Sequence, residues 1–312
     1  MIRFIISRLI QFPLILAVIY LITFFMAWVV PGDPFQKNDK NLSPTALLAR
    51  RREFHAENWR TFLGYYSGRV LLHADFGQSM EYDEWSVNDI LRTSLPVSIS
   101  LGLVSLVIAV SIGVSVGTFA AVRRGGLFDW SSLGIVLFGI SLPGFVAAAL
   151  LRIFFAIKLN WFPISEWGTL RAMVLPGIAL ALLPMAYIAR LTRVSMIDTL
   201  GSDFVRTARA KGLSRSMVIW KHALRNAMLP VLSYLGPAAA YALTGSFVVE
   251  QVFHIPGLGQ HFVHSVQNRD RTLILGTVIV YSFFLLSFNL LVDIGYAFVD
   301  PRIDVTAKAP DA

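Results

Sequence analysis

Histidines are the residues of this 312-residue chain whose type and spacing first suggest chemistry. His254, His261 and His264 lie close together in the sequence. Imidazoles at i and i+3 can share a helix face and bind a transition metal. No carboxylate or thiolate stands at a spacing that would complete such a site, so solvated loop histidines are the simpler interpretation. We therefore expect no metal site.

Catalysis and nucleotide binding have no recognisable residues in the sequence. The chain has no cysteine, which excludes disulfides, thiolate metal ligands and cysteine nucleophiles. Its hydroxyls and histidines occur in unrelated segments, and no Gly-x-x-x-x-Gly-Lys-Ser/Thr phosphate cradle occurs. We expect a chain that is not an enzyme and that binds no cofactor itself.

One basic segment, residues 191–227, has the pattern of two short helices joined by a glycine. Ser202 can cap the first helix, with Asp203 near the positive end of the helix dipole. Gly212 suits a left-handed helix end, and Ser214 can cap a second helix. This segment is the candidate site.

The first of these helices combines a modest apolar face with positive charge. Phe204, Ala208 and Leu213 provide the apolar face, while Arg206, Arg209 and Lys211 provide the charge. A short helix with small residues can lie in a groove of a partner protein. A basic amphipathic segment resting on anionic lipid is the alternative at this point.

The elements that position this segment are apolar and long. The chain is 55% hydrophobic and 15% charged, whereas an ordinary soluble domain carries about 25% charged residues. A helix needs about 20 apolar residues to cross a bilayer, and only helices or closed barrels satisfy their backbone in lipid. We expect an all-α polytopic membrane protein with six spans, at residues 9–30, 97–121, 132–157, 173–190, 228–249 and 273–298.

Basic residues set the expected orientation, because cytoplasmic loops carry an excess of lysine and arginine. The net charge of +8 thus indicates membrane topology and not nucleic-acid binding. With both termini in the cytoplasm, the inner side holds Arg3, Arg8, Arg123, Arg124, Arg190, Arg193, Arg206, Arg209, Lys211, Arg215, Lys221, Arg225, Arg302 and Lys308. The two short outer loops hold only Lys158, Arg171, Arg269 and Arg271.

Residues 31–96 form an outer loop too long for a simple connector. It contains a charged, helical-looking stretch from Pro44 to Tyr66. We expect a small helical cap on the outer face, within a single transmembrane domain of residues 1–312. The tail after Pro301 is expected to be disordered.

The last outer loop is expected to contribute to an outer gate. Its candidate residues are Glu250, Pro256, Gly257 and Gly259, and the glycines are free to take positive φ in a tight turn.

Several features inside the spans have more than one interpretation. Gly113 and Gly117 permit close helix contact, more simply within the subunit than against a second one. Pro143-Gly144 can kink its span. Arg152 can face a cavity or snorkel to the headgroups, and Asp293 is an isolated acidic residue without the partners of a proton relay.

The segment from Val205 to Leu213 resembles the EAA loop of permeases in ATP-binding-cassette importers, in the form of the dipeptide, oligopeptide and nickel branch. Ala208 and Gly212 match the second alanine and the glycine of the general pattern. Arg206 and Thr207 replace its glutamate and first alanine, so a salt bridge from that glutamate cannot be carried over.

The resemblance extends over nearly the whole chain. Motifs similar to those of the branch follow in the right order: Arg8-Leu9, Pro31-Gly32-Asp33-Pro34, Asp75-Phe76-Gly77-Gln78-Ser79, His222 to Ala227 with Leu229-Pro230, Glu250 to Gly259, and Asp300-Pro301-Arg302.

The resemblance implies a permease in the bacterial inner membrane, paired with a second permease that is normally a different chain. Two ATP-binding subunits would hold ATP and Mg²⁺, and a periplasmic solute-binding protein would deliver the solute. Phe204, Arg206, Ala208, Arg209, Gly212 and Leu213 are then the ATPase-coupling residues. A gradient-driven secondary transporter and a non-transport membrane scaffold are the alternatives, and the former predicts buried carboxylates and inverted repeats that are not visible. The solute is left open among peptides, nickel complexes, sugars and peptide antibiotics.

Overall fold

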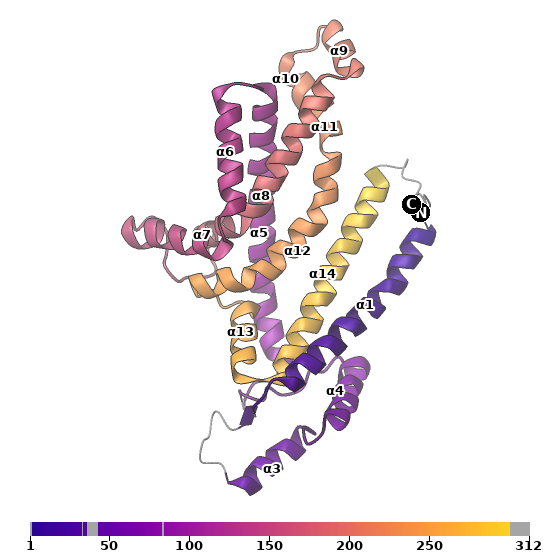
Figure 1. Ribbon diagram of the computed structural model, residues 1–312, viewed down its shortest axis with the longest axis vertical. Helices are drawn as coiled ribbons and strands as arrows, with labels where there is room; N and C mark the ends of the chain where they lie inside the picture. Colours follow the sequence, from indigo (N-terminus) through magenta and orange to yellow (C-terminus); the bar gives the residue numbers. More distant parts are fainter. Residues whose placement is uncertain (1, 33, 36–42, 83, 300–312) are drawn as a thin grey trace. The chain divides into compact units, whose positions relative to one another are not determined.

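The computed structural model describes residues 2–32, 34–35, 43–82 and 84–299 (Figure 1). The motif residue Asp33, the motif at residues 300–302 and the tail with Lys308 lie outside these ranges. Within them the regular elements are helices, and β-structure is limited to one isolated bridge between Gln78 and Ser86. The expected all-α class is confirmed.

The α-helices are named as in Figure 1. In chain order they are α1 (Ile2–Val29), α3 (Pro44–Glu53), α4 (Trp59–His73), α5 (Val87–Val122), α6 (Leu127–Ser141), α7 (Gly144–Leu151), α8 (Leu170–Leu200), α9 (Asp203–Ala210), α10 (Arg215–Met217), α11 (Leu224–Ala227), α12 (Leu229–Phe253), α13 (Leu258–Asn268) and α14 (Arg271–Val299). Two π-helical segments, Arg152–Lys158 and Val218–Ala223, follow α7 and α10 respectively.

Five of these helices are long and apolar enough to cross a membrane, namely α1, α5, α8, α12 and α14. The predicted third span, residues 132–157, is instead a pair of helices, and the number of spans is six only if that pair counts as one. Helix α8 also runs to Leu200, so residues 191–200 belong to it and not to a loop.

The break in the third segment lies at Pro143. Helix α6 ends at Ser141 and α7 begins at Gly144, and the axes of Leu127–Ser141 and Gly144–Lys158 differ by 106°. Proline has no N–H to donate and disfavours the helical conformation of the residue before it. The Pro143 carbonyl instead accepts the first hydrogen bonds of α7, from the N–H groups of Val146 (2.9 Å) and Ala147 (3.1 Å).

The chain forms two compact units. Unit 1 comprises residues 100–253 and the described residues from 287 to 299, and unit 2 comprises residues 2–99 and 254–286. Because α5 and α14 each contribute residues to both units, the single permease domain stays a prediction.

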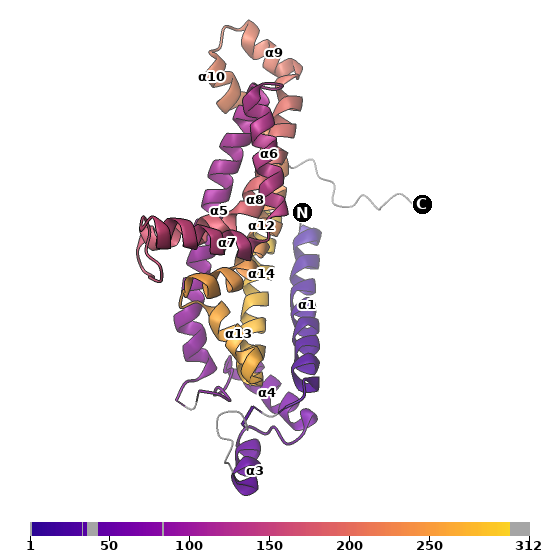
Figure 2. The same cartoon turned by 60° about the vertical axis from the view of Figure 1, so that its left-hand side comes forward.

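In unit 1, α8 is the central helix, and α5 and α6 run beside it in both views (Figures 1 and 2). Glycines make the α5 contact close. A β-carbon on Gly113 would lie 2.8 Å from the Met185 carbonyl oxygen, and one on Gly117 would lie 2.5 Å from that of Ala189. The prediction that these glycines pack within the subunit is confirmed.

In unit 2, stacked aromatic rings join α1 to α4. Phe24 lies 6.1 Å from Phe62, which lies 5.6 Å from Tyr66, and all three side chains are buried. The Tyr66 hydroxyl donates to the Thr272 carbonyl oxygen of α14 at 3.1 Å.

The predicted helical stretch from Pro44 to Tyr66 is two helices, because the chain turns at His55, whose φ is 51°. That α3 and α4 form a cap on the periplasmic face stays a prediction.

Candidate functional site

Helix α9 begins in a turn directly after α8. Ser202 precedes the helix in an extended conformation (ψ 155°), as predicted for a cap residue. Its hydroxyl does not cap α9, however, but donates to the Thr199 carbonyl oxygen of α8 at 2.6 Å. The expected side-chain cap is therefore wrong, because the Ser202 hydroxyl is directed toward the end of α8 and accepts from no N–H of α9. Asp203 does lie in the first turn of α9, where its negative charge interacts favourably with the positive end of the helix dipole.

Helix α9 ends in a Schellman motif centred on Gly212. The glycine has a φ of +78°, the N–H of Leu213 donates to the Ala208 carbonyl oxygen (3.3 Å), and the N–H of Gly212 donates to that of Arg209 (3.0 Å). The predicted left-handed helix end is confirmed.

The second helix of the segment is short and changes its hydrogen-bonding pattern. Ser214 caps α10 as predicted, its hydroxyl accepting from the Met217 N–H at 3.3 Å. The π-helical segment Val218–Ala223 follows, and α11 then returns the chain to α-helical geometry. The sequence contains no proline or glycine that would have indicated this change.

The buried face of α9 consists of Val205, which is fully buried, and Ala208. Both pack in one cluster with Met196 of α8, Ala121 of α5 and Val218 of the π-helical segment. Sequence reasoning missed Val205, although its i, i+3 spacing from Ala208 places both residues on one helix face.

Of the predicted apolar residues, Leu213 also packs against this cluster. Phe204 does not belong to the buried face, because 44% of its surface is exposed. The expected apolar face is therefore corrected to Val205, Ala208 and Leu213.

The exposed side of α9 combines an aromatic ring with positive charge. Phe204 lines a cavity of about 840 Å³ together with the basic or polar side chains of Lys221, His222, Arg225 and Asn226. The side chain of Arg206 is 74% exposed and is hydrogen-bonded to Asp203 at 3.3 Å. This surface can bind a partner that offers acidic groups beside an apolar pocket.

Arg209 lies on a different side of α9. It lines a second cavity, beside the turn at Gly212 and the end of α5. The structure therefore divides the six predicted coupling residues between an exposed surface, a buried face and a helix end.

A buried ion pair fixes α8 near the start of α9. Asp129, at the beginning of α6, accepts from Arg193 Nε (2.5 Å) and Nη2 (2.8 Å) and from the Gly125 N–H (2.9 Å). The Asp129 and Arg193 side chains are 4% and 20% exposed. The pair joins the turn between α5 and α6 to α8.

The predicted outer-gate residues lie in helices or at a helix start, and not in one loop. Glu250 is buried within α12, and Gly259 is buried within α13. Gly257 precedes α13 with an extended backbone (φ −94°), whereas His254 has a φ of 55°. The expected positive φ at the glycines is wrong.

Helix α13 begins with an unusual cap. Gly257 has no side chain to cap the helix, and the Ser98 hydroxyl of α5 accepts from the Leu258 N–H at 2.9 Å instead. This hydrogen bond to Ser98 therefore connects α5 to the start of α13, directly after the turn that contains Pro256.

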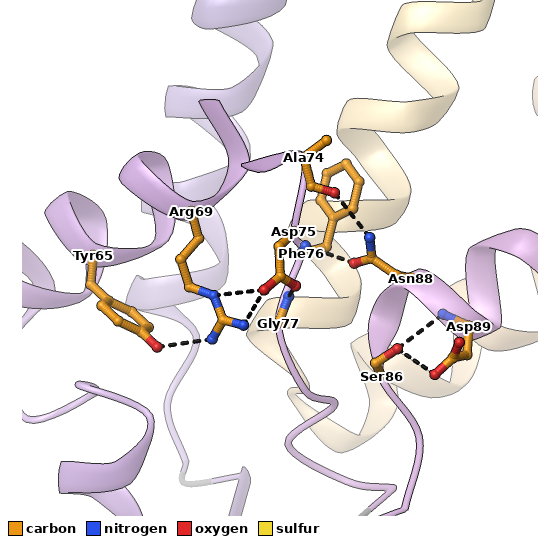
Figure 3. Close-up of polar contacts among 9 residues, drawn as sticks. All are labelled: Tyr65, Arg69, Ala74, Asp75, Phe76, Gly77, Ser86, Asn88 and Asp89. Atoms are coloured by element: carbon orange, nitrogen blue, oxygen red, sulfur yellow. Dashed lines mark hydrogen bonds and ion pairs between the residues drawn. The ribbon is translucent and has the colours of Figure 1, made fainter. Parts of the chain in front are cut away.

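The motif at residues 75–79 forms a hydrogen-bonded network that sequence reasoning did not assign (Figure 3). Asp75 accepts from Arg69 Nε of α4 at 3.0 Å and from the Gly77 N–H at 2.8 Å. Burial alone would raise the pKa of Asp75, but these hydrogen bonds outweigh it, so the pKa lies below its usual value. Asn88 of α5 accepts from the Phe76 N–H (2.8 Å) and donates to the Ala74 carbonyl oxygen (2.9 Å).

Asp270 is the buried carboxylate that joins this motif to α14. One oxygen accepts from the Ser79 hydroxyl and from the Met80 N–H (3.0 Å). The other accepts from the Thr272 hydroxyl (2.8 Å) and the Leu273 N–H (3.0 Å), which caps α14. Its position three residues before the apolar run that begins at Leu273 was the available sequence signal.

Replacing Asp270 with asparagine should destabilise the protein, because one oxygen becomes a donor that faces other donors. The expected loss is about 1–3 kcal/mol of the free energy of unfolding, measured by thermal unfolding of the purified chain in detergent. Asp89→Asn, at an exposed carboxylate on α5, is the matched control and should unfold like the wild type. Equal behaviour of the two variants would contradict the role of Asp270.

The remaining candidate residues do not converge on a site. His261 and His264 lie on α13 and not in a loop, and burial together with the neighbouring His264 lowers the pKa of His261. Within the part of the chain that the structure describes, no group of three or more His, Cys, Asp or Glu residues could hold a metal ion. Arg152 starts a π-helical segment and is partly buried, and Asp293 lies in α14.

Comparison with known proteins gives a family match and close relatives. Residues 113–305 match the family described as "Binding-protein-dependent transport system inner membrane component". The dipeptide transport system permease protein DppB of Bacillus subtilis is 42% identical over 308 residues, which cover 99% of this chain and all of that protein. The oligopeptide transport system permease protein OppB of Salmonella typhimurium is also 42% identical, over 97% of this chain and 99% of its own length.

Solved structures share the fold at lower identity. Two inward-facing crystal forms of the MetNI methionine ABC transporter align with TM-scores of 0.54 and 0.52, at 18% and 19% identity. Each alignment covers 68% of this chain and 96% of the other.

Proposed function

The chain belongs to the family of binding-protein-dependent transport system inner membrane components, and on this premise we propose how its basic segment couples transport to ATP hydrolysis. It is a permease subunit of an ATP-binding-cassette importer and a multi-pass protein of the bacterial inner membrane. Permease subunits of this family are not enzymes, and a partner ATPase hydrolyses the ATP. The secondary transporter and the scaffold are thereby excluded.

Helix α9 is proposed to be the contact with the ATPase. The observation that supports this is the division of its side chains. Val205 and Ala208 are buried against α8 and the π-helical segment, while Phe204 and Arg206 are exposed. A force on the exposed side therefore reaches α8 through packed side chains. Closure of the ATPase subunits would displace α9 and rearrange the spans between outward-open and inward-open states.

The proposed assembly contains a second permease, two ATP-binding subunits that hold ATP and Mg²⁺, and a periplasmic solute-binding protein. The expected orientation follows from it, with α9 and both termini in the cytoplasm and residues 31–96 in the periplasm. Peptides are the proposed solute, because the two relatives that are 42% identical are named as dipeptide and oligopeptide permeases. A growth screen of a deletion strain on defined peptides tests the solute independently of the coupling mechanism.

The coupling role predicts that Arg206→Glu weakens attachment of the ATPase. Charge reversal on an exposed site opposes an acidic partner surface, and retained ATPase should fall about tenfold, which corresponds to 1.4 kcal/mol. The measurement is co-purification in mild detergent. Arg60→Glu, the same change at an exposed position of α4, should retain the ATPase fully.

Topology gives a second readout of the same proposal. Because the chain has no cysteine, Lys211→Cys provides a unique site for a membrane-impermeant maleimide. Labelling is expected in inside-out vesicles and not in intact spheroplasts. Labelling from the outside would refute the coupling role of α9.

The outer-gate role of residues 256–259 is a separate proposal. The hydrogen bond from the Leu258 N–H to the Ser98 hydroxyl connects the start of α13 to the N-terminal part of α5. A cysteine at Gln260, cross-linked to the second permease, should block uptake, and reduction should restore it. Full uptake in the cross-linked form would refute the gate.

A further inference from the structure

A cavity of about 390 Å³ lies beside the turn between α9 and α10. Its wall is apolar, with Val122 from the end of α5, Leu200 from the end of α8 and Val218 from the π-helical segment. Two guanidinium groups, those of Arg209 and Arg215, line the same cavity. The cavity thus combines positive charge with an apolar surface. We call it the α9–α10 cavity.

Both arginines are exposed, and neither has an acidic partner among the residues that the structure describes. Two more basic residues, Arg123 and Arg124, directly follow the lining residue Val122 in the sequence and add positive charge to this region. A guanidinium group can bind a phosphate through two parallel hydrogen bonds. The composition of the cavity therefore favours an anion that carries an apolar portion.

Exposed aromatic residues adjoin the cavity. Trp220 follows Ile219, which lines the cavity, and its ring lies 6.1 Å from that of Phe119, one turn before Val122. Phe119 in turn lies 6.5 Å from Phe128 of α6. These three side chains are between 41% and 48% exposed. Exposed tryptophans and other aromatic rings at the ends of membrane spans gather at the level of the lipid headgroups.

We propose that the α9–α10 cavity binds an anionic phospholipid, with Arg209 and Arg215 on the headgroup phosphate and the acyl chain against the apolar wall. The aromatic side chains favour this occupant over an acidic segment of the ATPase, because they place the cavity at headgroup level. Basic pockets between helices at the cytoplasmic membrane surface bind phospholipid headgroups of this kind. The binding does not depend on the coupling role of α9.

Binding can be tested on the full-length chain with a single label. Ser216→Cys introduces a unique, exposed cysteine beside Arg215 for a fluorophore. The protein is reconstituted in phosphatidylcholine vesicles that contain a small fraction of either spin-labelled phosphatidylglycerol or spin-labelled phosphatidylcholine. We expect stronger quenching by phosphatidylglycerol. Arg215→Ala should lower this preference about fivefold, as loss of one basic residue at an anionic surface predicts.

Arg225→Ala is the matched control, because Arg225 is an exposed arginine of the same segment that lines the larger cavity with Phe204. It should leave the lipid preference unchanged. Equal quenching by the two lipids would overturn the proposal. So would a label that neither lipid quenches and that becomes shielded only when the ATPase subunits bind, since the occupant would then be the partner protein.

Discussion

Replacing Gly212 with valine should reduce solute uptake about tenfold while ATP hydrolysis by the attached ATPase continues. Gly212 has a φ of +78°, and an L-residue in the left-handed region costs about 1–2 kcal/mol. That strain lowers the population of the Schellman turn by about tenfold. With the turn broken, Leu213 no longer fixes the end of α9 against the buried cluster. The measurement is uptake and ATPase activity of the complex in vesicles.

Two further variants distinguish the effect of the Gly212 turn on coupling from a general loss of stability. Gly212→Asn should keep most of the uptake, because asparagine tolerates the left-handed conformation. Gly125→Val imposes a similar strain in the turn between α5 and α6, where φ is +79° and no atom lies within 4 Å of the added β-carbon. It should reduce stability without uncoupling hydrolysis from uptake. Uncoupling by both valine variants would remove the special role of Gly212.

Asp129→Asn should cause the largest loss of stability of any single change considered. The substitution leaves the guanidinium of Arg193 without its counterion, and the Arg193 side chain is only 20% exposed. Removing one partner of a buried ion pair costs about 3–5 kcal/mol. The purified chain should therefore unfold at a clearly lower temperature in detergent.

A second ion pair of the same chain serves as the control. Asp203 and Arg206 lie 3.3 Å apart, but their side chains are 95% and 74% exposed. Asp203→Asn should leave the unfolding temperature unchanged, because exposed pairs contribute little. Replacing both Asp129 and Arg193 by apolar residues should recover part of the lost stability. A single Asp129→Asn variant as stable as the wild type would contradict the assigned role of the pair.

The sequence predicts local features of this protein better than it predicts packing. The left-handed end at Gly212 and the cap at Ser214 follow from backbone rules that act over a few residues, and both are confirmed. The apolar spans follow from composition, and the prediction that they are helices is confirmed. The break at Pro143 was visible as a possible kink, but its size of 106° was not.

Contacts between distant segments could not be read from the residues alone. Ser202 is a residue type that caps helices, yet its hydroxyl is directed toward the Thr199 carbonyl at the end of α8 and caps nothing in α9. Asp129 and Arg193 are 64 positions apart, and Ser79 and Asp270 are 191 apart, so nothing local pairs them. Phe204 and Val205 are adjacent apolar residues, and only the position of α8 decides which of them is buried.

The glycines of α5 also restrict how unit 1 can move. With β-carbons absent at Gly113 and Gly117, the α5 backbone lies against the carbonyl groups of α8, and neither helix can slide along the other without a steric clash. We therefore expect residues 100–122 of α5 to move together with α8 as one body. Deformation during a transport cycle must then be absorbed at the joints around that body, where the chain bends, and not along the seam between α5 and α8.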